Sequence, residues 1–306
     1  MKLDINKYTI EYTVLEKLVL PEYSGSTFRG VFGHALKQLS CINMNEDCSI
    51  CQHSKECIYS LVFETKSPEN DIPPFPGMNY IPHPFILRPG KKTMGHLRAG
   101  DVFSLELNIY GRFIDWSHYF LKALQNTGKI GAGKGKGKFR LNRIVDRASG
   151  NVLYRDGAYF SSPVTETLSL NYEKSYNNIQ MQIITMLRFV KNRRMVDDLT
   201  PEILFKEGSR RFRILVHYYG QIDDEYDYRS IIESAKTIRF QNNLSVKKIS
   251  RYSNRRNKYI NIDGLIGNMF MEGVPPQNYA LLKVLEETHL GKSTVMGLGR
   301  IKIRKT

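Results

Sequence analysis

The sequence predicts an α+β protein built from two copies of one unit, and three observations support this prediction. Residues 8–14 alternate apolar and polar side chains, which is the pattern of a half-buried strand. A helical segment, a glycine-rich basic loop and a strand follow one another at residues 119–141, and the same order returns at residues 279–304. A repeat of this length indicates a duplicated unit, and a chain of 306 residues is long enough for two medium domains.

The first unit opens with the strand at residues 8–14 and a helix that we predict over residues 26–39. Ser26 or Thr27 is expected to cap this helix, because a hydroxyl oxygen accepts hydrogen bonds from the free backbone amides of a first turn. The apolar side chains recur at helical spacing and form one stripe that should face the core; it consists of Phe28, Phe32, Ala35, Leu36 and Leu39.

The remaining elements complete the unit and repeat it. A second alternating strand is predicted at residues 101–109 and a helix at residues 115–125. The second half is predicted to hold a helical region, two strands, a helix and a last strand, at residues 176–220, 245–251, 259–271, 279–285 and 300–304. The simplest unit with this order is βαββαβ, the ferredoxin-like arrangement. We therefore expect two tandem ferredoxin-like domains, 1–162 and 163–306, that meet at Ser161-Ser-Pro163.

All four cysteines lie in one short stretch of the first domain with the spacing C-x6-C-x2-C-x5-C; they are Cys41, Cys48, Cys51 and Cys57. In a reducing compartment such clustering indicates a metal site before it indicates disulfides. Four thiolates from a compact loop suit a closed tetrahedral Zn²⁺ site, which is structural and leaves no open position for catalysis. An iron–sulfur cluster, two local disulfides and four free thiols are the alternatives. Together with the proline-rich stretch that follows, this loop forms an insertion at residues 41–100.

The composition indicates a polyanionic partner. The chain has 45 Lys and Arg against 30 Asp and Glu, which gives a net charge of +15 and favours nucleic acid as the partner. The apolar fraction of 41% is enough for packed cores and excludes a disordered tail protein. No apolar run reaches the roughly 18–20 residues of a membrane span, and the first residues lack the apolar core of a signal peptide. We therefore expect a cytoplasmic protein without a membrane partner.

The two glycine-rich basic loops do not fit the P-loop pattern G-x4-G-K-[ST] of nucleotide-binding sites. In the first loop Gly135 occupies the Ser/Thr position that would hold Mg²⁺, and in the second Glu286 replaces the first glycine. We expect both loops to bind a phosphodiester backbone instead, because glycine lets backbone amides approach phosphates and the interleaved lysines supply charge.

A third basic cluster, at residues 247–259, interleaves arginine and lysine with tyrosine. Arginine beside tyrosine offers charge together with a stacking plane for unpaired bases. A solvated basic face that only keeps the protein soluble is the plain alternative. From the three clusters, the side chains that we predict to bind RNA are Lys134, Lys136, Lys138, Arg140, Arg251, Arg255, Arg256, Lys292 and Arg300.

The sequence holds no obvious cluster of the carboxylates with which nucleases bind pairs of Mg²⁺ ions. RNA permits a metal-independent route, in which its own 2′-OH attacks the adjacent phosphate with the help of a base, an acid and cations. On an ideal helix His34 lies about 140° from the centre of the apolar stripe, and Lys37 lies about 60° from His34 on the same polar face. This pair suits a general base and a charge stabiliser. A surface histidine that only hydrogen-bonds is the alternative.

Several short segments, spread in order over most of the chain, match one family. They are Phe28-Arg-Gly-Val-Phe-Gly-His-Ala-Leu-Lys37, Cys57-Ile-Tyr-Ser-Leu-Val-Phe63, Pro82-His-Pro-Phe-Ile-Leu87, the first glycine-rich loop, Arg251-Tyr-Ser-Asn-Arg-Arg256, Gly264-Leu-Ile-Gly267 and Gly297-Leu-Gly-Arg300. On these segments the chain resembles the CRISPR-associated endoribonucleases that process precursor crRNA, within the RAMP superfamily. The resemblance implies two ferredoxin-like domains and metal-independent cleavage within CRISPR repeat RNA, which yields a 2′,3′-cyclic phosphate and a 5′-OH.

The resemblance also implies which residues carry the chemistry. Enzymes of this kind often use a histidine on the first helix as general base, which assigns His34 to that role with Lys37 and Tyr23 assisting. No catalytic cofactor is implied, and subunits of a CRISPR effector complex are expected as further partners. Two other interpretations stay open: a non-catalytic RNA-binding subunit that uses the same surfaces, and a zinc-stabilised scaffolding protein whose basic charge is incidental.

Overall fold

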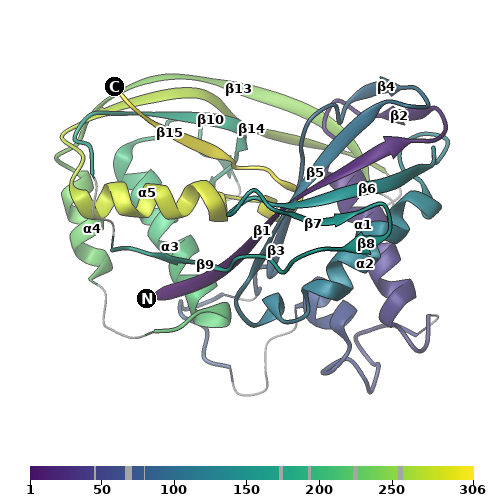
Figure 1. The fold of residues 1–306 in the computed structure, drawn as a ribbon. Coiled ribbons are helices and arrows are strands. Elements are labelled where there is room, and N and C mark those ends of the chain that lie inside the picture. Colours follow the sequence, from purple (N-terminus) through teal and green to yellow (C-terminus); the bar gives the residue numbers. More distant parts are fainter. Residues whose placement is uncertain are drawn as a thin grey trace. The chain divides into compact units, whose positions relative to one another are not determined.

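The chain forms two compact units. The N-terminal unit comprises Asp4–Glu166, and the C-terminal unit comprises Met1–Leu3 together with Thr167–Thr306. Figure 1 shows their elements. No helix within the described ranges is both long and apolar enough to cross a bilayer. The structure is a computed structural model, and it describes residues 1–44, 46–65, 71–78, 80–171, 175–191, 194–222, 227–253 and 258–306, except for the side chains of residues 251–253 and 258–259.

The N-terminal unit is an antiparallel sheet with helices α1 and α2 packed side by side (Figure 1). The main sheet has the strand order β3-β5-β1-β6-β7-β8, and β2 and β4 form a separate two-stranded sheet. The elements are β1 (Lys2–Val14), β2 (Leu18–Leu20), α1 (Gly25–Ser40), the π-helix η1 (Ser60–Glu64), β3 (Phe85–Pro89), β4 (Gly95–Leu97), β5 (Val102–Tyr110), the 3-10 helix η2 (Gly111–Ile114), α2 (Ser117–Ile130), β6 (Phe139–Asp146), β7 (Val152–Arg155) and β8 (Ala158–Tyr159), with β9 (Glu166–Ser169) leading onward.

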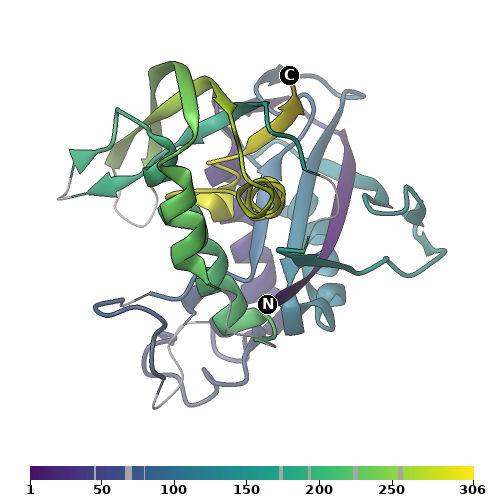
Figure 2. The ribbon, with the colours of Figure 1, turned by 90° about the vertical axis from the view of Figure 1, so that its left-hand side faces the viewer.

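The C-terminal unit is built around a four-stranded antiparallel sheet of order β13-β14-β10-β15. Helices α3 and α5 pack against each other, and Figure 2 views α5 along its axis with α3 beside it. The elements are β10 (Ile179–Leu187), β11 (Val190–Lys191), β12 (Arg194–Met195), α3 (Pro201–Tyr219), α4 (Tyr228–Ala235), β13 (Arg239–Ser253), β14 (Lys258–Glu272), α5 (Pro276–Thr288), the 3-10 helix η4 (Thr294–Met296) and β15 (Ile301–Lys305).

The two units share one topology. In each, a first strand is followed by helix, strand, strand, helix and strand, formed by β1, α1, β3, β5, α2 and β6 in one unit and by β10, α3 with α4, β13, β14, α5 and β15 in the other. In both sheets the first strand lies between the third and the fourth, and the second strand is at the edge beside the third. The predicted α+β class is confirmed, with the sheets antiparallel.

Helix α1 buries the predicted apolar stripe in an aromatic core. Phe28 stacks on Phe103 with 5.5 Å between the ring centroids, and Phe32 meets Phe85 edge-on at 5.4 Å. Leu39, the last member of the predicted stripe, is only half-buried. The side chains that anchor α1 are therefore those of its first three turns.

The start of α1 corrects the predicted cap. The N-cap residue is Ser24, and its side chain makes no capping hydrogen bond. Ser26 and Thr27 both lie inside the first turn, so neither occupies the position from which a hydroxyl oxygen reaches the free amides.

The predicted helical region 176–220 is wrong in its first half. Ile179, Met181 and Ile183 are buried and alternate with polar, half-buried residues, so this segment forms the strand β10. Alternation with a period of two places all the apolar side chains on one face of a strand, whereas a helix would distribute them around its axis. The helix α3 begins only after Thr200, whose hydroxyl caps it.

Each unit has a glycine-rich loop that packs on the segment following its first strand. In the N-terminal unit Gly133 has a φ of +70°, and a Cβ added to it would lie 2.0 Å from the Val19 carbonyl oxygen. The amide of Lys134 donates to that same oxygen at 3.0 Å. Glycine is required here for two reasons, since it tolerates the positive φ and leaves room for the carbonyl.

The C-terminal unit repeats this contact. Gly291 has a φ of +77°, and an added Cβ would lie 2.5 Å from the Arg188 carbonyl oxygen. The amide of Lys292 donates to that oxygen at 2.9 Å. A glycine followed by a lysine therefore makes the same backbone contact in both units. This shared contact supports the predicted duplication.

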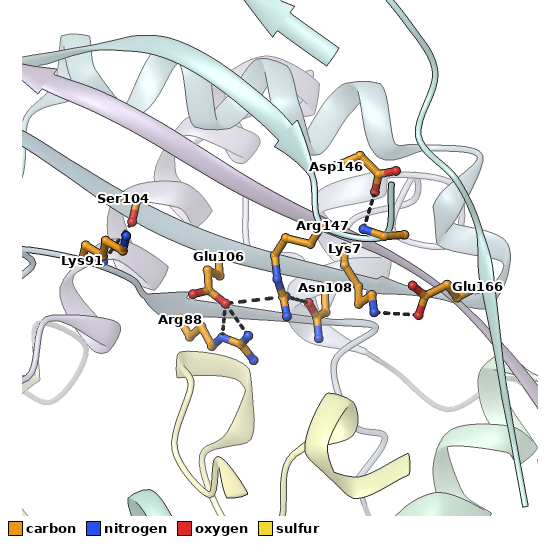
Figure 3. A network of polar contacts seen from close by, with 10 residues as sticks. Lys7, Arg88, Lys91, Ser104, Glu106, Asn108, Asp146, Arg147 and Glu166 are labelled. Carbon is orange, nitrogen blue, oxygen red and sulfur yellow. Dashed lines mark hydrogen bonds and ion pairs between the residues drawn. The ribbon is translucent and has the colours of Figure 1, made fainter. Parts of the chain in front are cut away.

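Charged side chains from neighbouring strands form a polar network in the N-terminal unit (Figure 3). Arg88 and Glu106 are cross-strand partners on β3 and β5, with 2.8 Å between Arg88 Nε and Glu106 Oε2. Arg147 Nη1 lies 3.6 Å from the same carboxylate oxygen and donates to Asn108 Oδ1 at 2.9 Å. The side chain of Arg88 is only 4% exposed, so the Glu106 carboxylate is the counter-charge that makes its burial tolerable.

Glu106→Ala should lower the free energy of unfolding by about 3–5 kcal/mol, because it leaves the buried Arg88 guanidinium without its charge partner. Glu11→Ala is the matched control. Glu11 pairs with Arg143 across β1 and β6 at 2.6 Å, but the Arg143 side chain is 41% exposed, so the loss should be at most about 1 kcal/mol. Urea unfolding measures both values. Equal losses would contradict the dependence on burial.

Gly133→Ala should destabilise the fold more than Gly135→Ala. Both glycines have a positive φ, +70° and +85°, but a Cβ at position 135 would meet nothing within 4 Å. The positive φ alone costs alanine about 1–2 kcal/mol, and the clash with the Val19 carbonyl adds about 1–3 kcal/mol at position 133. Thermal unfolding compares the two variants. Equal melting temperatures would show that the loop does not depend on the close approach.

Candidate functional site

The first glycine-rich loop presents cations to solvent. Lys134 and Lys136 are exposed, as is Arg140 on β6. Lys138 has a different position, because its Nζ donates to the two carbonyl oxygens at the C-terminus of α2 at 2.8 and 3.1 Å. A cation at this end of a helix is stabilised by the helix dipole. Of the four predicted RNA-binding side chains in this region, three therefore extend into solvent and the fourth caps a helix.

Two of the backbone amides in the glycine-rich loops are engaged by the protein itself. The amides of Lys134 and Lys292 donate to protein carbonyl oxygens, so neither is available to a phosphate. The glycines permit close packing of the chain, and the lysine side chains supply the charge. In the second loop Lys292 is exposed, whereas Arg300 is half-buried and its amide donates to Thr185 Oγ1 at 2.9 Å.

The third basic cluster is only partly covered by the described residues. Arg251 lies on β13, paired with Ile260 of β14, and its side chain is among those not described. Arg255 and Arg256 lie outside the described residues. Earlier on β13, Lys248 is exposed and pairs across the hairpin with Asp263. The nearby Arg188 guanidinium hydrogen-bonds to the Asp263 carboxylate and lowers its pKa, with a smaller contribution from Lys248.

His34 lies on the solvent side of α1. Its neighbours Gly33 and Ala35 are buried, while the imidazole itself is exposed, as the phase of the helix predicts. Within the described part of the chain no hydrogen bond engages the ring. The side chain is therefore accessible to a ligand in solution, and its position is set by the helix backbone.

Lys37 follows His34 by one turn of α1 and reaches toward the cysteine loop. Its Nζ donates to the Met44 carbonyl oxygen at 3.2 Å and lies 5.8 Å from the centroid of the Tyr59 ring. Tyr23 is half-buried and precedes the N-cap, about 16 Å from His34 along the helix axis at 1.5 Å per residue. The structure thus places His34 and Lys37 on adjacent turns and does not bring Tyr23 to them.

A second histidine, in the family-like segment Pro82-His-Pro-Phe-Ile-Leu87, contacts α1. His83 Nδ1 lies 2.9 Å from the Val62 carbonyl oxygen and must donate to it, which leaves Nε2 to accept from Arg29 Nη2 at 3.1 Å. The Arg29 guanidinium lies 4.9 Å from the centroid of the Phe63 ring, and that ring covers Gly33 so closely that an added Cβ would lie 2.8 Å from it. These contacts hold η1 against α1 beside His34. They join segments 54 residues apart, so spacing along the chain could not have revealed them.

The cysteine loop begins where α1 ends. Cys41 is the C-cap of α1, and Cys57 Sγ lies 4.0 Å from the carbonyl oxygen of Ser40, the last helical residue. Burial raises the pKa of the Cys48 thiol, Lys37 lowers it, and the neighbouring thiols of Cys41 and Cys57 raise it further. The four thiols are half-buried and none is in a disulfide. Within the described residues, no three His, Cys, Asp or Glu side chains are grouped closely enough to hold a metal ion.

Two family models match the chain. The first, AF_1859_N, is described as an N-terminal domain and matches residues 3–166. The second, described as CRISPR-associated endoribonuclease Cas6, matches residues 181–301. A protein of Archaeoglobus fulgidus, named only as uncharacterized, is 25% identical over 228 residues, which are 71% of either chain.

Solved structures of Cas6 proteins share the fold. A partial Cas6-RT-Cas1–Cas2 complex matches with a TM-score of 0.59 and 12% identity over 99% of this chain, which spans 46% of that longer chain. A Cas6 product complex matches with a TM-score of 0.58 and 15% identity, over 98% of this chain and 100% of the other. Thermus thermophilus Cas6 matches with a TM-score of 0.56 and 12% identity, over 98% of both chains.

The ranges of the two family models agree with the two units described above. The first model ends where the N-terminal unit ends, and the second lies wholly within the C-terminal unit. The first model covers more than half of the chain, so the chain belongs to the AF_1859_N family of N-terminal domains, and most of its second half matches the model of the CRISPR-associated endoribonuclease Cas6.

Proposed function

We propose that this protein binds CRISPR repeat RNA and cleaves precursor crRNA without a metal ion. The observation that carries the proposal is the exposed imidazole of His34 on the first helix, which no described residue hydrogen-bonds, in a chain whose second half matches the Cas6 model. In the reaction the 2′-OH of one nucleotide loses its proton and attacks the adjacent phosphate, and the bond to the 5′-oxygen breaks as that oxygen takes a proton from water. The products are a 2′,3′-cyclic phosphate and a 5′-OH.

His34 is the general base that draws the proton from the 2′-OH. An exposed imidazole can take this proton near neutral pH, where histidine ordinarily changes its charge. Lys37, one turn away, stabilises the charge that develops on the phosphate once its ammonium turns from the Met44 carbonyl toward the RNA. Tyr23, at the other end of the helix, assists by contact with a neighbouring nucleotide, because its distance from His34 is too great for a shared proton.

The partners follow from the same proposal. The exposed cations of the two glycine-rich loops, Lys134, Lys136 and Lys292, bind the RNA backbone together with Arg140 and Arg300. Arg251 of β13 adds to them, as do Arg255 and Arg256, which lie outside the described residues. Cas6 structures have been solved as a product complex and as part of a Cas6-RT-Cas1–Cas2 complex, which supports CRISPR RNA and CRISPR proteins as partners here. We also infer that both units are ferredoxin-like, since each has the βαββαβ order and the same strand neighbours.

The four cysteines are proposed to hold a structural Zn²⁺. Cys41 is the C-cap of α1, Cys57 Sγ lies 4.0 Å from the carbonyl oxygen of the preceding residue, Ser40, and Cys48 and Cys51 are three residues apart in the loop between them. A tetrahedral four-thiolate site has no open position, so the ion would fasten the end of α1 to the start of η1 and take no part in cleavage.

His34→Ala should slow single-turnover cleavage of repeat RNA by about 10²–10⁴-fold, because it removes general base catalysis. RNA affinity and melting temperature should stay near the wild-type values, since the side chain is exposed. His118→Ala, which removes another exposed histidine of the same unit, is the control and should cut at the wild-type rate. Wild-type cleavage by the His34 variant would remove this residue from the role. Binding of repeat RNA without any cut by the wild-type protein would identify a non-catalytic RNA-binding subunit instead.

Purified protein should contain about one zinc ion per chain by elemental analysis. Cys48→Ser should lose most of this metal and lower the melting temperature, because thiolate ligands supply folding free energy when they bind the ion. Brief EDTA treatment should leave wild-type cleavage intact. Protein that is free of zinc and iron when purified under reducing conditions would contradict the site, and an absorbing iron–sulfur chromophore would replace zinc with a cluster.

A further inference from the structure

The small sheet of β2 and β4 brings together basic residues that lie far apart in the sequence. Val19 on β2 pairs with His96 of β4 on one side and with Lys134 of the first glycine-rich loop on the other. Directly paired residues of antiparallel strands point to the same face of a sheet. His96 and Lys134 therefore flank Val19 on one face, about 10 Å apart, since neighbouring strands lie about 4.8 Å from each other.

Two further basic residues lie at the ends of these strands. Lys17 directly precedes β2 and Arg98 directly follows β4, and both line one cavity together with His96. Lys17, His96 and Arg98 are exposed. The opposite face is apolar and buried, with at most 4% exposure for Leu18, Leu20 and Leu97. The small sheet is thus fixed by its apolar side, and four basic residues lie on its other side or at its strand ends around one apolar residue; we call this the β2–β4 face.

The β2–β4 face is hollowed where its basic side chains meet. A cavity of about 430 Å³ is lined by Lys17, His96, Leu97, Arg98 and Ala99. No carboxylate is among these lining residues. The adjacent carboxylate of Asp101, which is not among the lining residues, accepts a hydrogen bond from the backbone amide of Arg98 at 2.8 Å. An anion in the hollow would meet two full positive charges and an imidazole.

We propose that the β2–β4 face binds the sugar–phosphate backbone of single-stranded RNA outside the cleavage site. Lys17, Arg98 and Lys134 each neutralise a phosphate, His96 hydrogen-bonds to a phosphate or ribose oxygen, and Val19 contacts the apolar side of a ribose. The proposal rests on the proposed function, because the RNA is the substrate of that function. It adds a contact made by the N-terminal unit alone that uses no residue of α1.

The test measures binding of two RNAs, the CRISPR repeat and a uridine homopolymer that holds no cleavage site, over a range of salt concentrations. For Lys17→Ala/Arg98→Ala the slope of log K against log[salt] should fall in magnitude by about 1.4, since each lost contact removes about 0.7 on a single strand. The affinity should fall about 25-fold at 0.1 M salt, and the difference should vanish toward 1 M. His96→Ala should weaken binding by about 2- to 10-fold, as expected for one hydrogen bond.

Arg112→Ala/Lys122→Ala is the matched control, because it removes the same charge from exposed positions of the same unit away from the β2–β4 face. It should leave the salt slope unchanged, and circular dichroism should show both double variants to be folded. Equal losses in the two double variants, or wild-type binding by Lys17→Ala/Arg98→Ala, would overturn the proposal while leaving the cleavage function intact. If the wild-type protein binds neither RNA, the proposed function fails and this proposal fails with it.

Discussion

One backbone contact, made once in each unit, determines where the lysine side chains of the two glycine-rich loops lie. The Val19 and Arg188 carbonyl oxygens accept from the amides of Lys134 and Lys292, at 3.0 and 2.9 Å. Each contact brings two backbones so close together that the preceding residue has to be glycine. Because the accepting carbonyl lies in the segment that follows the first strand of its unit, the loop is fixed to that segment rather than left as a free hairpin. The positions of the Lys134 and Lys292 side chains therefore depend on this contact.

The attachment also explains why glycine and lysine alternate in these loops. A glycine-rich loop in solution would expose its amides as well as its lysine side chains, and either could bind phosphate. Here the amides of Lys134, Lys136 and Lys292 already donate to protein carbonyl oxygens, so the affinity for a polyanion is expected to come mainly from the cationic side chains. Such binding follows the phosphate backbone and depends strongly on salt, with little information about base sequence. Recognition of a particular repeat would then have to come from other residues.

Much of the fold could be predicted because its main elements bury large side chains at regular spacing. Phe28 and Phe32 mark α1, and the alternation at residues 8–14 marks β1, whatever the rest of the chain does. The prediction of a helix in the region of β10 is wrong because the buried residues Ile179, Met181 and Ile183 recur every second residue, which is the spacing of a strand. The strands β2 and β4 have three residues each, too few for any periodicity. Their pairing is decided by the glycine-rich loop far along the chain, so their shared basic face appears only in three dimensions.

The histidines show why the candidate site was harder to predict than the fold. His289 is fully buried and bonds to the Leu298 carbonyl oxygen at 3.0 Å, and His83 joins Arg29 to η1, so the packing of the protein requires an imidazole at both positions. Among the described residues, no hydrogen bond requires one at position 34. The periodicity of the helix predicts that His34 is exposed to solvent. It does not predict a role as general base, because no pattern in the neighbouring residues indicates one. Because His34 is exposed, a substitution there removes the imidazole without disturbing the core. A loss of cleavage in such a variant therefore reports on the reaction and not on the stability of the fold.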